Sequence, residues 1–575
     1  MYRTPLTLHK GLHRGETPIV YVMISTPMGW RGYSTKEINS GFAEEESPHL
    51  ADGTITADGT YTAGAGGYGI LDLQGRIVSI GKLSRTIRPS NTDIIGAYQN
   101  RQLQHISFTL ADHDDYFTKM LPSEPLLNSE VRIYVGFDSD PHTDHLRIFN
   151  GYISSIKATS IGVEINAEER FTLGNTFFLT RSGRYSEPLY TNDRLPIVYG
   201  DLTDGSLGNW VLPCIDVDAA GGKPVYCFAA HEVLSVANGN TITIYENDLE
   251  LNSALYTFDE ANDYEGLGTI ATITFTSPKT GSIITARGKG KPTASGGATL
   301  MENVIDIIYD FLTVHNSLTS ANFNSTSKAK AQATFTAQSY KAAGVIGEDI
   351  GFWELIQRMM GSFFGSCYLD ANNLLCLDIE TNTVNEADKV AIFRYSDIVF
   401  AEGEQTLENL INQCPASYGY DYARGSEFNH HTDDSAHGDA ISQSVYGIRK
   451  PAQPYRFYWC RDLTTVNAIQ DIIVAKLKDP LWMVRIDDLT LTNIHVDVGD
   501  IIVATIKRLY DRAGDQLINH LWRVTGVQPN LKKRSITYTL EDTGQFAYIQ
   551  TYLADGSYKA DGSIHAGSDR DITEY

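Results

Sequence analysis

The densest group of side chains that could bind a metal ion lies between residues 427 and 439. Imidazole and carboxylate groups together suit several divalent transition metals, and this stretch contains both. The candidate ligands are His430, His431, Asp433, Asp434, His437 and Asp439. No helical or strand periodicity fixes their spacing, so we predict a solvated polar loop here and no metal site.

Three further aspartates could hold a calcium ion through alternating carboxylate oxygens. They are Asp138, Asp140 and Asp144, on both sides of Pro141. The loop lacks the central glycine and the terminal glutamate of a calcium-binding EF-hand. We therefore predict that it forms the tip of a β-hairpin.

The glycine-rich run 288–292 superficially suggests a phosphate-binding loop. It lacks the spacing of a P-loop, and Pro292 removes a backbone N–H that such a loop needs, so we predict a linker into the helix near Met301.

His231-Glu232 has no second histidine at the spacing of a zinc-protease helix. No nucleophile elbow stands out, and no carboxylate pair does either. We predict a protein that is not an enzyme, without catalytic residues, cofactor-binding residues or metal ligands.

The balance of charges is acidic. The chain has 46 basic and 70 acidic residues among 575, a formal net charge of −24. Phosphate contacts need Lys and Arg, so this balance argues against a protein that wraps nucleic acid. It fits a passage through which DNA slides without binding, because like charges repel.

The cysteines indicate a reducing compartment. They form no C-x-x-C pair and no zinc spacing. They are Cys214, Cys227, Cys367, Cys376, Cys414 and Cys460.

The N-terminal residues lack the apolar core of a signal peptide, and no run approaches the ~20 apolar residues that span a bilayer. We expect a soluble chain with no stable membrane insertion.

Two stretches of short strands, at 70–171 and 482–542, have a similar pattern. Each has a strand, an acidic loop, a strand with a central Gly or aromatic residue, a short turn, and a strand that ends in Glu. The first series passes through Val131, Gly151 and Glu168, and the second through Val503, Trp522 and Glu541. Alternating apolar and polar residues are typical of half-buried strands. We predict two related antiparallel barrels that share a pattern and not residue identity.

Three helices and a hairpin are predicted between and within these stretches. Apolar residues recur at helical spacing from Met301 to Leu312, from Phe352 to Phe363, and from Val466 to Leu477. Asn238-Gly239 predicts a tight hairpin turn between strands at 233–236 and 241–245, because both residues tolerate positive φ.

The predicted fold class is mainly β with some α, in several domains. We expect two tube-like antiparallel barrels, an inserted β domain and a helix–hairpin domain. The predicted boundaries are 1–180 for the first barrel, with an insertion near 33–69, then 181–295 for the inserted β domain, 296–395 for the helical α+β domain, 396–550 for the second barrel with one helix, and 551–575 for a repetitive tail.

A short Ala-Asp-Gly repeat occurs at 51–53 and 57–59, and again at 554–556 and 560–562. One interpretation is a β structure that stacks on other chains or on a fibre. The other is a flexible glycine-rich tip, because so few units cannot bury a core alone. The sequence leaves both open.

The order of these elements resembles that of the baseplate or tail-tip hub proteins of tailed bacteriophages. The likeness spans roughly residues 1–550. Its motifs are 149–153 with 164–168, the opening 195–200 of the inserted domain, the helix–hairpin unit 352–379, and 409–421 with 444–449 and 498–500. These hubs are related to those of contractile tails and of type VI secretion spikes.

The resemblance implies a homotrimer at the distal end of a tail tube, located in the virion and assembled in the bacterial cytoplasm. Two barrels per subunit would match a trimer to a sixfold ring. The implied partners are a distal tail ring or tail tube protein, the tape measure protein and a central fibre or receptor-binding protein, with transient passage of DNA. We expect neither the C-terminal cysteine cluster nor the appended peptidoglycan hydrolase of some relatives, so cluster binding and cell-wall cleavage are not carried over. A receptor-binding adhesin and a tail-associated carbohydrate-active enzyme are the alternatives.

Overall fold

The computed structural model describes most residues between 19 and 546. The longer stretches outside the description are 1–18, 45–53, 63–68, 87–104, 138–144, 169–178, 180–193, 205–211, 218–223 and 547–575, and shorter gaps interrupt the rest. Strands dominate and helices are few, which confirms the predicted fold class. No helix in the described part is long and apolar enough to cross a membrane.

The first sheet has nine strands in the order β3-β6-β2-β1-β10-β11-β12-β9-β7. The strands are β1 (Ile19–Thr26), β2 (Gly29–Ser34), β3 (Ile38–Glu44), β6 (Gly69–Gln74), β7 (Ile77–Ile80), β9 (His105–Ala111), β10 (Glu130–Gly136), β11 (Leu146–Thr159) and β12 (Gly162–Glu168). A short helix, α3 (Tyr116–Met120), follows β9 and buries Phe117. β3 lies inside the segment predicted as an insertion and pairs with β6.

The second sheet has the order β25-β31-β32-β33-β30-β26. Its strands are β25 (Lys389–Phe393), β26 (Ile398–Glu404), β30 (Met483–Asp488), β31 (Ile501–Tyr510), β32 (Gln516–Asn530) and β33 (Ser535–Phe546). A seventh strand, β8 (Arg85–Thr86), comes from the N-terminal part of the chain and pairs with β32. Within the described residues, no ladder joins the two end strands of either sheet, so closure into barrels is not seen.

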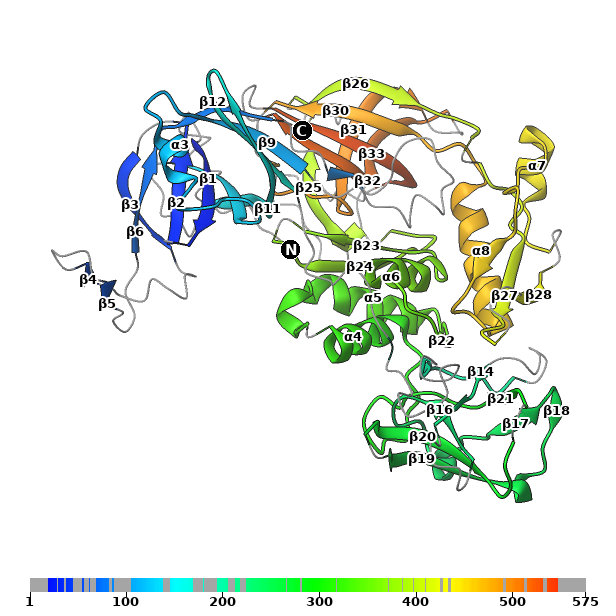
Figure 1. The fold of residues 1–575 in the computed structure, drawn as a ribbon. Coiled ribbons are helices and arrows are strands. Elements are labelled where there is room, and N and C mark those ends of the chain that lie inside the picture. Colours follow the sequence, from blue (N-terminus) through cyan, green and yellow to red (C-terminus); the bar gives the residue numbers. More distant parts are fainter. Residues whose placement is uncertain are drawn as a thin grey trace, which may run out of the picture.

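The two sheets lie next to each other at one end of the molecule (Figure 1). One hydrophobic cluster includes residues of both, such as Val22 and Phe108 from the first sheet and Ile486 and Trp522 from the second. The burial of alternate residues follows the pleat, as in β9, where Ile106, Phe108 and Leu110 are inside.

The inserted β unit lies at the opposite end (Figure 1). It contains two four-stranded sheets formed by β14 (Leu212–Pro213), β15 (Ile215–Asp216), β16 (Val225–Ala229), β17 (Thr243–Glu246), β18 (Leu249–Glu250), β19 (Tyr256–Tyr264), β20 (Gly268–Phe275) and β21 (Ile284–Arg287). The hairpin predicted at Asn238-Gly239 is wrong. Gly239 does have a φ of 85°, but it ends a 3-10 helix, and the amide of Leu234 bonds to Gly290 instead of to an adjacent strand.

The longer helices lie between the sheets and the inserted unit (Figure 1). The three predicted from periodicity are present as α4 (Val304–His315), α6 (Phe352–Gly361) and α8 (Leu463–Leu477). Besides α3, two helices were not predicted: α5 (Ser325–Ala337), which has no apolar face and buries only two of its residues, and α7 (Ala440–Tyr446). Short strands accompany them: β13 (Ile197–Tyr199), β22 (Gly344–Ile346), β23 (Gly365–Leu369), β24 (Leu375–Ile379), β27 (Ala416–Tyr420), β28 (Phe428–His431) and β29 (Tyr455–Phe457).

The second predicted barrel domain, 396–550, does not form one structural unit. Residues between Ile411 and Leu477 share a hydrophobic cluster with α4 and α6 instead of with the second sheet. Trp459, for example, is buried against Tyr199, with ring centroids 6.5 Å apart. The second sheet is therefore interrupted between β26 and β30 by a segment that belongs to the helical unit.

The Ala-Asp-Gly triplets at 51–53, 57–59, 554–556 and 560–562 lie outside the described residues. The short strand β4 (Thr54–Ile55), between the first two triplets, pairs with β5 (Tyr61–Thr62), which follows the second.

Candidate functional site

The two sheets contain the same five-strand unit. In the first, the order β10-β11-β12-β9-β7 is antiparallel throughout. In the second, β31-β32-β33-β30-β26 repeats both the order and the direction. In each unit, three consecutive strands form an antiparallel meander: β10, β11 and β12 in the first sheet, and β31, β32 and β33 in the second. The strand before the meander, β9 or β30, pairs with the last strand of the meander, β12 or β33. We refer to them as unit 1 and unit 2.

The match extends to the pairing of individual residues. Four cross-strand pairs of unit 1 each correspond to one pair of unit 2. Ile133↔Phe149 corresponds to Ala504↔His520, Val135↔Leu146 to Ile506↔Leu517, Tyr152↔Glu168 to Arg523↔Glu541, and Ala158↔Val163 to Pro529↔Ile536. The register of each long strand shifts at the same place, after Ile153 in unit 1 and after Val524 in unit 2. A bulge is a specific backbone feature, and a one-residue slip in strand register would move every side chain of the strand to the opposite face of the sheet. The agreement in register and in bulge position therefore identifies a structural duplication.

The turn that leads into each meander is duplicated as well. The amide of Asn128 donates to the carbonyl of Ile153, and the amide of Gly499 donates to that of Val524, at 2.9 and 2.8 Å. In return, the amides of Ile153 and Val524 donate to the carbonyls of Ser129 and Asp500.

Side chains differ between the units in a compensating way. In unit 1, a Cβ on Gly151 would lie 2.6 Å from the ring of Phe149, so that ring needs the space above the glycine. In unit 2 the same two positions hold Trp522 and His520, whose rings are 5.0 Å apart, and the larger ring now stands where unit 1 has glycine. This exchange explains the predicted similarity of pattern without similarity of residues.

A buried ion cluster connects unit 2 to the helical unit. Arg523 of β32 donates to Glu380 at 2.5 Å and to Asp378 of β24 at 3.1 Å. Lys476 of α8 contacts the other oxygen of Glu380 at 2.7 Å. Although burial lowers the pKa of Arg523, the carboxylates of Glu380 and Asp378 raise it, and the net shift is upward. The cluster therefore holds full charges in the interior, where each depends on its partners.

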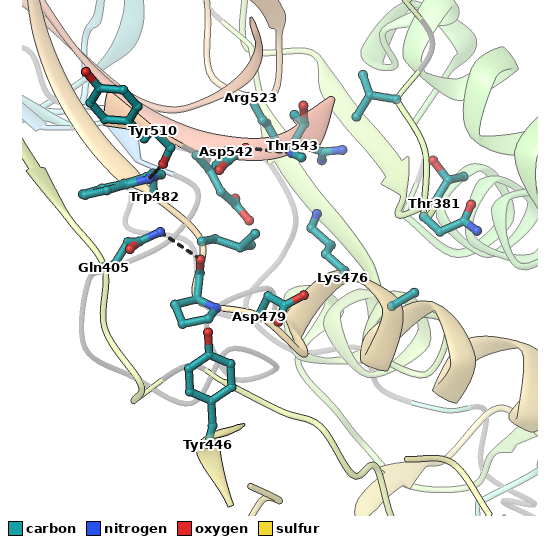
Figure 2. Close-up of a pocket in the computed structure, with 17 residues that line it drawn as sticks. Thr381, Gln405, Tyr446, Lys476, Asp479, Trp482, Tyr510, Arg523, Asp542 and Thr543 are labelled. Carbon is teal, nitrogen blue, oxygen red and sulfur yellow. Dashed lines mark hydrogen bonds between the residues drawn. The ribbon is translucent and has the colours of Figure 1, made fainter. Parts of the chain in front are cut away.

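Next to this cluster lies a pocket of about 510 Å³ (Figure 2). It is lined by the end of α8, by the segments that follow β24 and β26, and by β31, β32 and β33; labelled residues include Thr381, Gln405, Lys476, Asp479, Tyr510 and Asp542. Two pairs of wall groups are bonded to one another: the Trp482 indole donates to the Tyr510 carbonyl at 3.0 Å, and the Gln405 amide donates to the Pro480 carbonyl at 3.2 Å. The pocket lies where three parts of the chain meet.

The histidine-rich segment does not gather its candidate ligands. His437 bonds to Asp471 and Asn467, His431 bonds to Ser417, and His430 stacks on Tyr418. Asp439 instead caps α7 through the amide of Ser442 and pairs with Lys478. Asp433 and Asp434 lie outside the described residues, as do Asp138, Asp140 and Asp144. Among the residues described, no group of three or more His, Cys, Asp or Glu could hold a metal ion.

The run 288–292 is paired backbone and does not form a phosphate loop or a free linker. The amide of Gly290 donates to Gly200, and the amide of Lys291 donates to Val198. A Cβ on Gly290 would lie 2.4 Å from the Val198 carbonyl oxygen. The Lys291 amine is bound to Asp310 at 2.7 Å.

His231 also has a structural role. Its Nε2 accepts from the amide of Val198 at 2.9 Å, and its Nδ1 lies 2.7 Å from the carbonyl of Glu232. Burial lowers the pKa of His231 to about 4, which keeps the ring neutral and able to accept.

The sequence analysis missed the ion cluster and the crossing of β8 into the second sheet. The cluster had a sequence signal: Arg523 interrupts the apolar strand 521–524, and Glu380 directly follows the strand 375–379, in which Asp378 is the one charged residue among apolar neighbours. A lone charge in a buried strand needs a partner, although the sequence does not identify that partner.

No protein-family model matches the chain, and no curated protein matches it. Among solved structures, it is similar to the tail protein from Neisseria meningitidis MC58, at 8% identity and a TM-score of 0.32, over 82% of this chain and 96% of that one. It is also similar to the 43 kDa tail protein of prophage MuSo2 from Shewanella oneidensis, at 8% identity and a TM-score of 0.35, over 82% and 95%. A chain of the virion of a native gene transfer agent particle matches at 10% identity and a TM-score of 0.17, over 50% and 84%.

Proposed function

We propose that this protein is a structural hub at the tip of a phage tail, which acts as a homotrimer and carries out no catalysis. The observation that carries the proposal is the duplication of one sheet unit, with matching register, bulge and turn, inside a single chain.

The duplication has a direct geometric use. A closed ring of three copies presents six units of similar backbone structure, so a threefold ring can dock on a sixfold one. A single-unit chain would need six copies to offer the same surface. The order of elements noted in the sequence, which resembles that of tail hubs, supports the same assignment.

The charge and the arrangement of the chain suit such a role. With a net charge of −24, a ring of three copies would repel DNA that passes through it. The inserted unit lies at the end of the molecule away from the paired sheets (Figure 1). In the proposal, the sheets face a distal tail ring or tube protein and the tape measure protein, and the other end meets fibre or receptor-binding parts.

Mass photometry of the purified full-length chain tests the oligomeric state, and immunogold labelling of particles tests the location. We expect a mass three times that of the 63.6 kDa chain and label at one end of the tail. A chain that stays monomeric at micromolar concentration and is absent from particles would overturn the proposal. Degradation of cell-wall glycan by the purified chain would contradict its non-catalytic part.

A further inference from the structure

The two units differ at one edge. In unit 2, the pairing of β31 with β32 ends at Ile501↔Arg523, and β32 continues beyond it. Beyond that point, the short strand β8 pairs with the edge of β32 that β31 no longer covers, at Gly526 and Val527. Both of these residues are buried, as is Pro529.

The matching edge of unit 1 is open in the described part of the chain. There, β10 ends its pairing with β11 at Glu130↔Tyr152, and β11 continues to Thr159. The duplicated register makes Ser155 and Ile156 the equivalents of Gly526 and Val527. No described strand pairs with them on that side, and Ser154, Ser155, Lys157 and Ala158 are exposed.

The connection that donates β8 has a counterpart too. β8 follows β7, the outer strand of unit 1, and crosses to unit 2. In unit 2, β26 holds the place of β7, because it pairs with β30 as β7 pairs with β9. The chain that leaves β26 is the segment 405–407, in which Gln405 and Leu407 are exposed.

We infer that the β11 edge at 154–158 receives the segment 405–407 of a second copy of this chain as an added strand. This inference rests on the proposed trimer and names its contact. Within one chain, β8 follows unit 1 and pairs with β32 of unit 2. Between chains, the segment 405–407 that follows β26 of unit 2 would pair with β11 in unit 1 of the next copy. Three such contacts close a ring. Backbone hydrogen bonds supply the pairing, as in other strand additions.

Charge favours this pairing. The exposed edge of β11 carries Lys157, whereas the incoming segment is flanked by the exposed carboxylates of Glu404 and Glu408. An exposed strand edge otherwise invites unspecific association, which a dedicated partner prevents.

Hydrogen exchange on the unmodified chain, followed by mass spectrometry in dilute monomer and in trimer, tests the inference. We expect exchange in peptides covering 154–158 and 405–407 to slow by at least about tenfold in the trimer. The peptide covering 526–529 is the internal control, because β8 covers it in both states. A trimer in which either segment exchanges as in the monomer overturns the inference and leaves the trimer standing. A chain that never forms a trimer overturns both.

Two prolines give an independent test on the full-length chain. Ile156→Pro removes an amide from the edge that pairs, and we expect at least a tenfold weaker trimer. Ala158→Pro is the matched control, because its equivalent in unit 2 is Pro529, which lies beyond Val527, the last residue that pairs with β8, and has no amide hydrogen to donate. Equal trimer stability in two folded variants would contradict the inference. If Ile156→Pro does not fold, the exchange experiment decides.

Discussion

Asn128 and Gly499 occupy the same turn position in the two sheet units, with φ of 66° and 92°. Both are in the left-handed region, and both donate their amide to the bulged strand of their own unit. The two residues differ in what surrounds them: a Cβ at Gly499 would lie 2.5 Å from the Tyr368 hydroxyl. One turn therefore accepts a side chain and the other does not.

Gly499→Ala is expected to lower the free energy of unfolding by about 1–3 kcal/mol, because the strained φ adds to the clash with Tyr368. Asn128→Gly at the equivalent position is the control and should change it by less than about 1 kcal/mol, since glycine tolerates the same φ. Urea unfolding of both variants provides the measurement. Equal losses would contradict the difference between the turns.

Asp500 makes the stability of unit 2 depend on pH. Burial is the main cause that raises the pKa of this carboxyl, to about 7. Between pH ~4 and ~7, the folded chain therefore retains a proton that the unfolded chain has lost. The free energy of unfolding should fall as the pH rises through this window, by up to about 4 kcal/mol.

Asp500→Asn should flatten that dependence and stabilise the protein above pH 7, since the amide oxygen can still accept from the Asp497 backbone. Thermal melts at pH 5 and pH 8 compare the variant with the parent chain. A parent chain whose stability is the same at both values would refute the assignment.

Glu380→Gln is expected to cost about 3–5 kcal/mol, because it leaves Arg523 and Lys476 short of a buried counter-charge. Exposed Glu348, which contacts Arg358 at 2.9 Å, offers the matched control. Glu348→Gln should cost less than about 1 kcal/mol. Denaturant unfolding measures both, and losses of similar size would show that the buried cluster contributes no more than a surface pair.

Gly290→Ala should lower the melting temperature of the inserted unit, because the added Cβ meets the backbone of Val198. Lys289→Ala is the control: the Lys289 side chain is 24% exposed and makes only a long ion pair of 3.8 Å with Asp201, so the melting temperature should change little. Addition of ATP should shift neither melting curve, since the run is paired backbone and not a phosphate loop. Nucleotide-dependent stabilisation would contradict that assignment.

The sequence predicted what depends on local periodicity. Spacing of 3.6 residues located α4, α6 and α8, and alternation located β12 and β33, because amphipathic elements must turn one face to a core. It also predicted that two distant stretches share a pattern, from features as small as a central Gly151 or Trp522. Local turn chemistry was less reliable: Gly239 adopts positive φ, but its neighbours pair elsewhere.

Only the tertiary structure decided how distant segments meet. It placed the residues 411–477 with the helices, joined Arg523 to Glu380, and carried β8 to β32. A sequence pattern shows that a face or a charge needs a partner, but many partners satisfy that need equally well. The choice among them depends on the packing of the whole chain. The same holds for the finding that, among the described residues, a strand covers one of the two equivalent edges and none covers the other.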